Sequence, residues 1–227
     1  VSSVTRGIRS AVVERGVPEP RAVFLPNGVD TEAFSPDRGD ASVRAELGLP
    51  DDHLIAFTGT VGLAQGLGNV IDAIGSIGKQ GVSFAIVGSG SALAEMRSRA
   101  VDGGYDNIFF VDPVPRQTIA RLLPGCLAGV VSLADLATNQ GARPSKMFPI
   151  MASGIPILYC GSGEGASMVT SVGAGISIPN EVSTIRDAVL ELLDDEAERT
   201  AMGNRGREFV LAEMSWTSLV TEWLGEL

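Results

Sequence analysis

Two basic residues lie beside the start of a predicted helix, at the end of the segment ADLATNQGARPSK, whose last residue is Lys146. Arg143 and Lys146 carry the positive charges, and Ser145 can cap the helix by accepting a hydrogen bond from a free backbone N–H group. Cations beside the free N–H groups of a helix start attract phosphate oxygens. We therefore predict that Arg143 and Lys146 stabilise a diphosphate. The alternative is a capped helix with two solvated charges.

A glycine-rich loop follows the predicted strand HLIAFTG and opens the next helix. Gly59, Gly62 and Gly66 allow unusual backbone angles and a close approach of a ligand to the chain. Thr60 and Gln65 add polar side chains beside N–H groups that attract anions at a helix start. This loop is predicted to bind phosphate, although glycines that only permit tight packing would leave the same pattern.

Three further loops follow predicted strands and carry weaker signals. The segment VGSGS contains half of a dinucleotide-binding fingerprint, but Leu93 replaces its third glycine, which disfavours an NAD site. Pro113 and Val114 can present fixed backbone groups to a flat base, or form no more than a rigid turn. Glu164 can accept hydrogen bonds from sugar hydroxyls, or stabilise a helix start through its charge.

The composition excludes several classes of protein. The 227 residues have a formal net charge of −10, which repels a nucleic-acid backbone, so no nucleic-acid partner is expected. His53 is the only histidine, and Cys126 and Cys160 have neither zinc nor disulfide spacing, so neither a metal site nor a His-based triad is expected. No apolar run reaches the ~20 residues that span a membrane, and no signal peptide is visible. We expect a cytoplasmic protein with reduced thiols.

The elements that must position these loops alternate regularly from His53 onward. Apolar strands joined by crossover helices predict a doubly wound, Rossmann-like α/β sheet of about six parallel strands, with extra helices at the C-terminus. In such sheets ligands bind at the carboxyl ends of the strands, where the loops described above lie. The strands are predicted at 53–59, 82–88, 107–112, 127–133, 155–160 and 175–178, and the helices at 66–81, 91–104, 116–123, 145–154, 165–173, 183–193, 196–211 and 216–224.

The start of the chain differs from this pattern. Residues 1–16 predict an amphipathic helix with no strand before it, which is an unusual start for an α/β enzyme. A short strand is predicted at 22–25, and residues 31–40 are predicted to be a linker or boundary loop because Pro36 and Gly39 interrupt them. We therefore divide the chain into a first helix (1–20), a Rossmann-like domain (21–215) and a C-terminal helix (216–227).

The order of these segments resembles the C-terminal domain of GT-B glycosyltransferases of family 4, also called group 1. The family's segment between its two domains is similar to FLPNGVDTEAFSPD, and its first donor-side strand, loop and helix are similar to FTGTVGLAQGLGNVIDAI. In the family's order there follow FAIVGSGSALAEM, NIFFVDPVPRQTIARLL, RPSKMFPIMASGIPIL and the tail EFVLAEMSWTSLVTEWL. The likeness covers essentially the whole chain. Its AQGL and PSK loops resemble those of bacterial L-fucosamine transferases of surface-polysaccharide pathways.

The resemblance implies the donor-binding domain of a retaining glycosyltransferase that uses a UDP-sugar, such as an amino or deoxy sugar, and needs neither a metal nor a cofactor. It implies that residues 21–215 are the nucleotide-sugar-binding domain and that residues 1–20 are a helix carried over from an N-terminal domain. Residues 59–66 and 143–146 would meet the diphosphate and the sugar, and Pro113 and Val114 would lie against the base. The acceptor, a glycan or a lipid-linked glycan, would bind a missing N-terminal domain, so this chain alone should bind the donor weakly and catalyse little. A lipid-linked acceptor would imply peripheral association with the inner face of the plasma membrane.

Departures from the family pattern concern the ribose and the phosphates. Many members have two glutamates eight positions apart, the second of which binds the ribose, and the corresponding residues here are Gly141 and Pro149. Thr60 and Gln65 stand where many members have Arg and Lys. We consider as a hypothesis that Glu164 compensates for the absent ribose contact.

Three other functions are alternatives. A nucleotide-sugar epimerase needs acid/base side chains near the sugar, and a single histidine supplies few of them. A non-catalytic nucleotide-sugar-binding module would account for the absent glutamates. An NAD-dependent protein is disfavoured by the incomplete glycine fingerprint.

Overall fold

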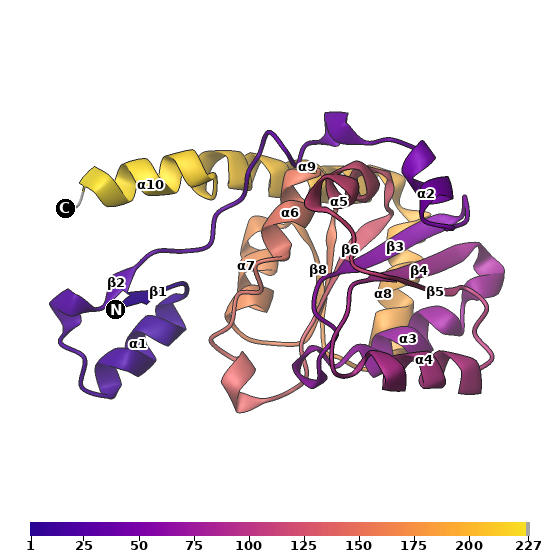
Figure 1. Cartoon of the computed structure of the whole chain (residues 1–227), viewed down its shortest axis with the longest axis horizontal. Coiled ribbons are helices and arrows are strands. Elements are labelled where there is room, and N and C mark those ends of the chain that lie inside the picture. The colour runs from indigo at the N-terminus through magenta and orange to yellow at the C-terminus, as the bar shows by residue number, and fades with distance from the viewer. Residues whose placement is uncertain (226–227) are drawn as a thin grey trace.

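Six parallel strands form the central sheet in the computed structural model, which describes residues 1–225 (Figure 1). Their order across the sheet is β5-β4-β3-β6-β7-β8, so the direction of winding reverses between β3 and β6. Ligands of such sheets bind at this reversal point, outside the carboxyl ends of the strands. The predicted doubly wound, Rossmann-like sheet is confirmed. The strands are β3 (His53–Thr58), β4 (Val82–Val87), β5 (Ile108–Val111), β6 (Ala128–Ser132), β7 (Ile157–Cys160) and β8 (Gly175–Ile178).

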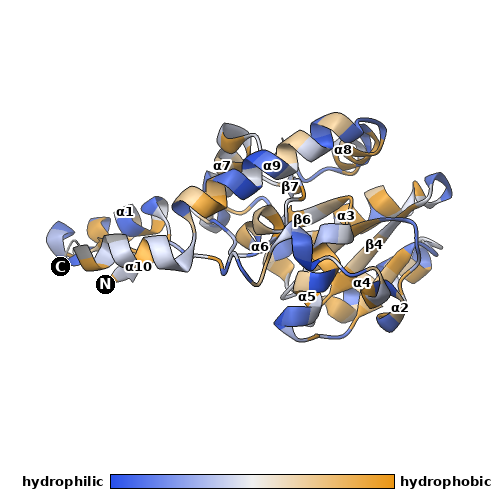
Figure 2. Ribbon diagram, turned by 90° about the horizontal axis from the view of Figure 1, so that it is seen from above, coloured by the Kyte–Doolittle hydropathy of each residue, from blue (hydrophilic) through white to orange (hydrophobic). Residues whose placement is uncertain are grey.

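Helices cover both faces of the sheet, because apolar strands joined by crossovers must be buried on both sides. Side chains of α3, α4 and α8 enter the core on one face, and side chains of α5, α6, α7 and α9 enter the core on the other. All residues of β4 are buried, and Figure 2 shows the strand as apolar between its helices. These helices are α3 (Leu67–Gly75), α4 (Leu93–Asp102), α5 (Arg116–Leu122), α6 (Met147–Ala152), α7 (Glu164–Val172), α8 (Val182–Asp194) and α9 (Glu196–Glu213), preceded by the short α2 (Ser42–Glu46).

The first and last described elements of the chain lie on the same side of the sheet domain, at the left of Figures 1 and 2. There β1 (Ser2–Ser3) pairs in parallel with β2 (Val23–Phe24), and α1 (Arg6–Glu14) connects them. The expectation that no strand precedes the first helix is therefore wrong. We call residues 1–25 together with α10 (Trp216–Gly225) the terminal unit. The division after residue 20 stays a prediction, and β2 on its far side pairs with β1.

Two chain segments connect the terminal unit to the sheet domain, and they are hydrogen-bonded to each other. The N–H of Val29 donates to the carbonyl oxygen of Met214 at 2.8 Å, and the N–H of Trp216 donates to the carbonyl oxygen of Val29 at 3.2 Å. Gly28 faces the indole of Trp216, since a Cβ atom at Gly28 would lie 2.8 Å from Trp216 Cδ2. We call these paired segments the crossing.

Residues 31–40, which were predicted to be a linker, are held against the sheet domain. Phe34 is only 3% exposed. The guanidinium of Arg207, in α9, donates to the carbonyl oxygens of Phe34 and Ala152 at 2.8 Å and of Thr31 at 3.1 Å. Because one partly buried cation joins two carbonyl groups of this segment to a carbonyl group of α6, the boundary segment is fixed in place rather than free.

Candidate functional site

A hollow of about 830 Å³ opens at the carboxyl edge of the sheet. It brings together the loops that follow β3, β4 and β5 and the segment that precedes α6. We call it the Lys146 hollow. Seven of the predicted donor-binding residues line it, namely Gly59, Thr60, Gln65, Pro113, Val114, Ser145 and Lys146.

The lining of the Lys146 hollow is cationic. Its charged residues are Lys146 and Arg116, and no Asp or Glu of the described chain lines it. Four other hollows within residues 1–225 each include at least one carboxylate, in a chain with a net charge of −10. The local field therefore favours an anionic ligand in the Lys146 hollow over these other sites.

Lys146 is held without an ion-pair partner among the described residues. Its Nζ atom lies 3.6 Å from the centroid of the Phe57 ring, so the face of an aromatic ring compensates part of its charge. Burial lowers the pKa of Lys146 from the ordinary 10.5 to about 8. A phosphate beside the ammonium would favour its charged form and raise this pKa again.

Gly59 and Gly88 bring the backbones of two strand-end loops together beside Lys146. Gly59 has a φ of +123°, and a Cβ atom there would lie 3.6 Å from Lys146 Nζ. Gly88 has a φ of +153°, and a Cβ atom there would overlap the carbonyl oxygen of Gly59. Both positions therefore require glycine. On this side of the ammonium the wall is glycine backbone without side-chain atoms, which leaves room for a phosphate.

The later glycines of the same loop, Gly62 and Gly66, line a neighbouring hollow of about 1040 Å³ instead. The side-chain oxygen of Gln65 accepts a hydrogen bond from the N–H of Gly62 at 2.9 Å, which closes the 3-10 turn Leu63–Gln65. The predicted contact between the Gly62 N–H group and a phosphate would have to replace this internal hydrogen bond.

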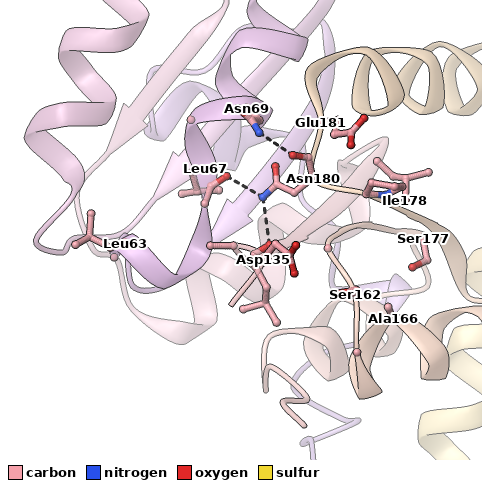
Figure 3. Close-up of a pocket in the computed structure, with 18 of the residues that line it drawn as sticks. Leu63, Leu67, Asn69, Asp135, Ser162, Ala166, Ser177, Ile178, Asn180 and Glu181 are labelled. Atoms are coloured by element: carbon pink, nitrogen blue, oxygen red, sulfur yellow. Dashed lines mark hydrogen bonds between the residues drawn. The ribbon is translucent and has the colours of Figure 1, made fainter. Parts of the chain in front are cut away.

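Asn180 joins several loops in the neighbouring hollow, as Figure 3 shows. Its Nδ2 atom donates to the carbonyl oxygens of Gly66 at 3.0 Å and Leu133 at 3.2 Å. Asp135 and Glu181 add carboxylates to the lining, and their negative charge opposes a phosphate there. Asn180 was missed in the sequence, where its position two residues after the last predicted strand was the available signal.

Ser145 does not cap the helix that follows it. α6 begins at Met147, and the residue before it, Lys146, provides no side-chain cap. The N–H groups of Met147 and Phe148 donate instead to the carbonyl oxygens of Pro144 and Ser145, at 3.1 and 3.3 Å. The predicted cap is therefore wrong, because a backbone turn already satisfies these N–H groups. Ser145 remains exposed in the lining of the Lys146 hollow.

Arg143 and Glu164 lie in a different hollow, beside the terminal unit. Arg143 Nε is 3.0 Å from Glu164 Oε1, and the arginine side chain is only 7% exposed. Glu164 Oε2 also accepts a hydrogen bond from the N–H of Gly7, in α1, at 3.1 Å. The structure thus does not bring Arg143 together with Lys146, because Glu164 compensates the guanidinium at another place. The roles predicted for Arg143 and Glu164 toward a donor stay predictions.

Two side chains of the Lys146 hollow were missed in the sequence. Arg116, at the start of α5, lies 4.9 Å from the centroid of the Phe34 ring and 3.7 Å from the carboxylate of Asp30. Trp216, at the start of α10, lines the same hollow and is 44% exposed. The position of Arg116 just after a predicted strand was a usable signal. Nothing local indicates that Trp216 returns to this site from the end of the chain.

Residues 1–225 contain neither a metal-binding cluster of side chains nor a membrane-spanning helix. No group of three or more His, Cys, Asp or Glu side chains in this range could hold a metal ion. No helix in the same range is long and apolar enough to cross a bilayer. The expectation that the protein works without a metal stays a prediction.

Known proteins match the chain along most of its length. It is 28% identical, over 231 residues, to a GDP-mannose-dependent alpha-(1-6)-phosphatidylinositol monomannoside mannosyltransferase of Mycobacterium tuberculosis, covering 98% of this chain and 60% of that protein. It is 27% identical, over 212 residues, to a D-inositol 3-phosphate glycosyltransferase of Kineococcus radiotolerans, covering 84% of this chain and 48% of that protein. The chain therefore spans about 60% or less of the length of these relatives.

Solved structures show the same fold. Anabaena HepE in complex with UDP and glucose superposes with a TM-score of 0.84 at 16% identity, covering 100% of this chain and 63% of that one. The C-terminal domain of a glycosyl transferase group 1 family protein (LpcC) from Francisella tularensis superposes with a TM-score of 0.69 at 18% identity, covering 83% of this chain and 100% of that one. The fold is therefore one Rossmann-like half of the GT-B architecture. The sequence signature of the family "Glycosyl transferases group 1" matches residues 40–209, and the chain is a member of that family.

Proposed function

We propose that this chain binds the diphosphate of a nucleotide sugar in the Lys146 hollow and forms the donor-binding part of a glycosyltransferase. The observation that carries the proposal is Lys146, a largely buried cation with no ion-pair partner among the described residues. It lies beside the glycine backbone at Gly59 in a hollow that no described carboxylate lines. Membership in a glycosyltransferase family supports sugar transfer as the reaction.

Lys146 has a specific role in this proposal. During transfer, the bond between the anomeric carbon and the diphosphate oxygen breaks, and negative charge grows on the departing nucleoside diphosphate. An ammonium group placed beside that oxygen stabilises the transition state, where the charge has grown, more than it stabilises the ground state. This difference lowers the activation barrier of the transfer. The anomeric carbon forms its new bond to an acceptor hydroxyl, and the proton of that hydroxyl passes to the departing diphosphate oxygen. We propose retention of the anomeric configuration as part of the same mechanism.

The proposed donor is a UDP-sugar, and the alternative donor is GDP-mannose. A protein of the same fold was solved with UDP and glucose, whereas the mycobacterial relative is named as GDP-mannose-dependent. Pro113 and Val114 line the hollow after β5, where their backbone groups can contact a base. Comparing the two nucleotides directly distinguishes the donors.

The acceptor is proposed to be a glycan or a lipid-linked glycan of cell-surface polysaccharide synthesis. The chain spans about 60% of its mycobacterial relative, so we propose that the acceptor binds a further domain. That relative is named for transfer to a phosphatidylinositol mannoside, which supports a lipid-linked acceptor. We propose a cytoplasmic enzyme that associates peripherally with the inner face of the plasma membrane.

Calorimetric titration with UDP and GDP tests the proposal. The chain has two lysines, Lys79 and Lys146, so Lys146→Met has a matched control in Lys79→Met. A hydrogen bond to a charged group contributes about 1.5–3 kcal/mol, so Lys146→Met should weaken binding of the preferred nucleotide by roughly tenfold or more. Lys79→Met should bind like the wild type. Equal affinity of Lys146→Met and the wild type would reject the proposal.

A further inference from the structure

One part of the Lys146 hollow is apolar and aromatic. Pro149, one turn into α6 beyond Lys146, lines the hollow together with Val29, Phe34 and Trp216. Phe34 is buried, but almost half of the surface of Trp216 is exposed. The indole therefore offers open apolar surface in the same hollow as the unpaired ammonium, within a volume that suits a ligand the size of a nucleotide.

The indole is fixed before any ligand arrives. A Cβ atom at Gly28 would lie 2.8 Å from Trp216 Cδ2 and 3.0 Å from Trp216 Cε3, so the ring packs directly on the backbone of Gly28. The backbone N–H of Trp216 is held by the carbonyl oxygen of Val29 at 3.2 Å. A side chain held in this way loses little conformational freedom when a flat group stacks on its open surface.

The hollow offers no carboxylate to a ribose. Nucleotide sites commonly hold the ribose with an Asp or Glu that accepts a hydrogen bond from the 2′-hydroxyl. No Asp or Glu of the described chain lines this hollow. Asp30 lies nearby, but it is already engaged with Arg116 at 3.7 Å and with the N–H of Ala33 at 2.9 Å. The side-chain oxygen of Gln65 is likewise bonded to the N–H of Gly62.

We propose that Trp216 contacts the nucleoside in this hollow and that its indole, rather than a carboxylate on the ribose, sets the affinity for the nucleoside. The base stacks on the indole while Lys146 holds the diphosphate, so the inference rests on the proposed function. Stacking is indifferent to the ribose hydroxyls, because every base has an aromatic face. The hollow therefore accepts 2′-deoxyribonucleotides as readily as ribonucleotides.

Tryptophan fluorescence reports this contact directly. The chain has two tryptophans, and Trp223 lines the hollow beside the terminal unit instead. Titration with UDP and GDP should change the emission of the wild type and of Trp223→Phe, and the change should disappear in Trp216→Phe. Trp216→Leu keeps an apolar side chain against Gly28 but removes the aromatic face, so its affinity should fall by about tenfold.

A comparison on the unaltered chain avoids any effect of substitution on folding. By calorimetry, 2′-deoxy-UDP and 2′-deoxy-GDP should bind within about twofold of UDP and GDP, because no bond to a carboxylate is lost. A loss of about tenfold or more on removal of the 2′-hydroxyl would overturn the inference. So would an emission change that persists in Trp216→Phe, or an unaltered affinity of Trp216→Leu.

The outcomes separate this inference from the proposed function. Nucleotide binding that depends on Lys146 but not on Trp216 leaves the proposed function intact and removes the inference alone. If neither UDP nor GDP binds the wild type, the inference and the proposed function are both rejected.

Discussion

Replacing Lys146 with methionine should stabilise the ligand-free chain, in addition to weakening its binding of nucleotides. The ammonium is largely buried, lacks a carboxylate partner among the described residues, and has its pKa lowered by burial to about 8. Methionine keeps most of the length of the side chain and its contact with Phe57. The variant therefore removes a buried charge with little loss of packing.

The magnitude follows from the pKa of Lys146. A lysine whose pKa is 10.5 in the unfolded chain and about 8 in the folded chain destabilises the fold by roughly 3 kcal/mol below pH 8. This cost decreases as the pH rises from about 8 to 10.5, because the folded state then releases its proton before the unfolded state does. The ring of Phe57 offsets part of the cost, so we expect about 1–2 kcal/mol at pH 7. For a chain of this size that corresponds to a rise of roughly 2–8 °C in melting temperature.

Thermal denaturation of the wild type, Lys146→Met and Lys79→Met at neutral and alkaline pH measures this effect. Lys146→Met should melt higher than the wild type near pH 7, and the difference should shrink toward pH 10.5, where the wild-type amine is neutral in the folded state and about half neutral in the unfolded state. Lys79→Met should follow the wild type at both pH values. A ligand-free Lys146→Met that melts below the wild type near pH 7 would refute the reasoning.

Three further results are expected. Nucleotide affinity measured by calorimetry should fall about tenfold between about pH 7 and 9, because binding needs the protonated ammonium of Lys146 and its pKa is about 8. Gly88→Ala should lower the melting temperature and block nucleotide binding, since its Cβ atom would overlap the carbonyl oxygen of Gly59. Glu164→Gln should leave nucleotide affinity nearly unchanged but make the terminal unit more sensitive to protease, because Arg143 loses the carboxylate that compensates its buried charge.

Each of these results has a control and a contrary outcome. Lys79→Met should show the wild-type pH profile, and a flat wild-type profile would argue against Lys146 as the phosphate ligand. Gly125→Ala should be nearly neutral, because the atom nearest its Cβ would be 3.8 Å away. Wild-type stability of Gly88→Ala would contradict the described contact between loops. A loss of nucleotide affinity in Glu164→Gln would place that carboxylate at the donor, as the sequence suggested.

The strands could be predicted closely because each is a short apolar run that ends at a polar or glycine-rich loop. The strand predicted at 82–88, for example, is β4 (Val82–Val87). The helix predicted at 66–81 instead ends at Gly75. The side chain of Asn107 donates to the carbonyl oxygens of Ile74 and Val82 at 2.9 Å, so it satisfies the end of α3 from another part of the chain. A hydrogen bond between distant residues leaves no periodic pattern in the sequence.

The same limit applies to the candidate site. The glycine loop and Lys146 could be found because parallel strands deliver their following loops to one edge of the sheet. The partner of Arg143 could not be found in the same way. Arg143 is close to Lys146 in sequence, which suggested that both bind one ligand, whereas in the structure Arg143 pairs with Glu164 beside the terminal unit. Trp216 could not be placed either, since its position depends on the path of the whole C-terminal helix region.

The crossing restricts how the terminal unit can tilt relative to the sheet domain. The backbones of Val29 and Ser215 are bridged in parallel, with hydrogen bonds from Val29 to Met214 and from Trp216 to Val29. Movement of one segment therefore moves the other, and Trp216 moves with both. Any tilt consequently reshapes the wall of the Lys146 hollow that Trp216 forms. A ligand in that hollow must then shift the orientation of the terminal unit, and a change of orientation must alter the ligand's affinity by the same free energy.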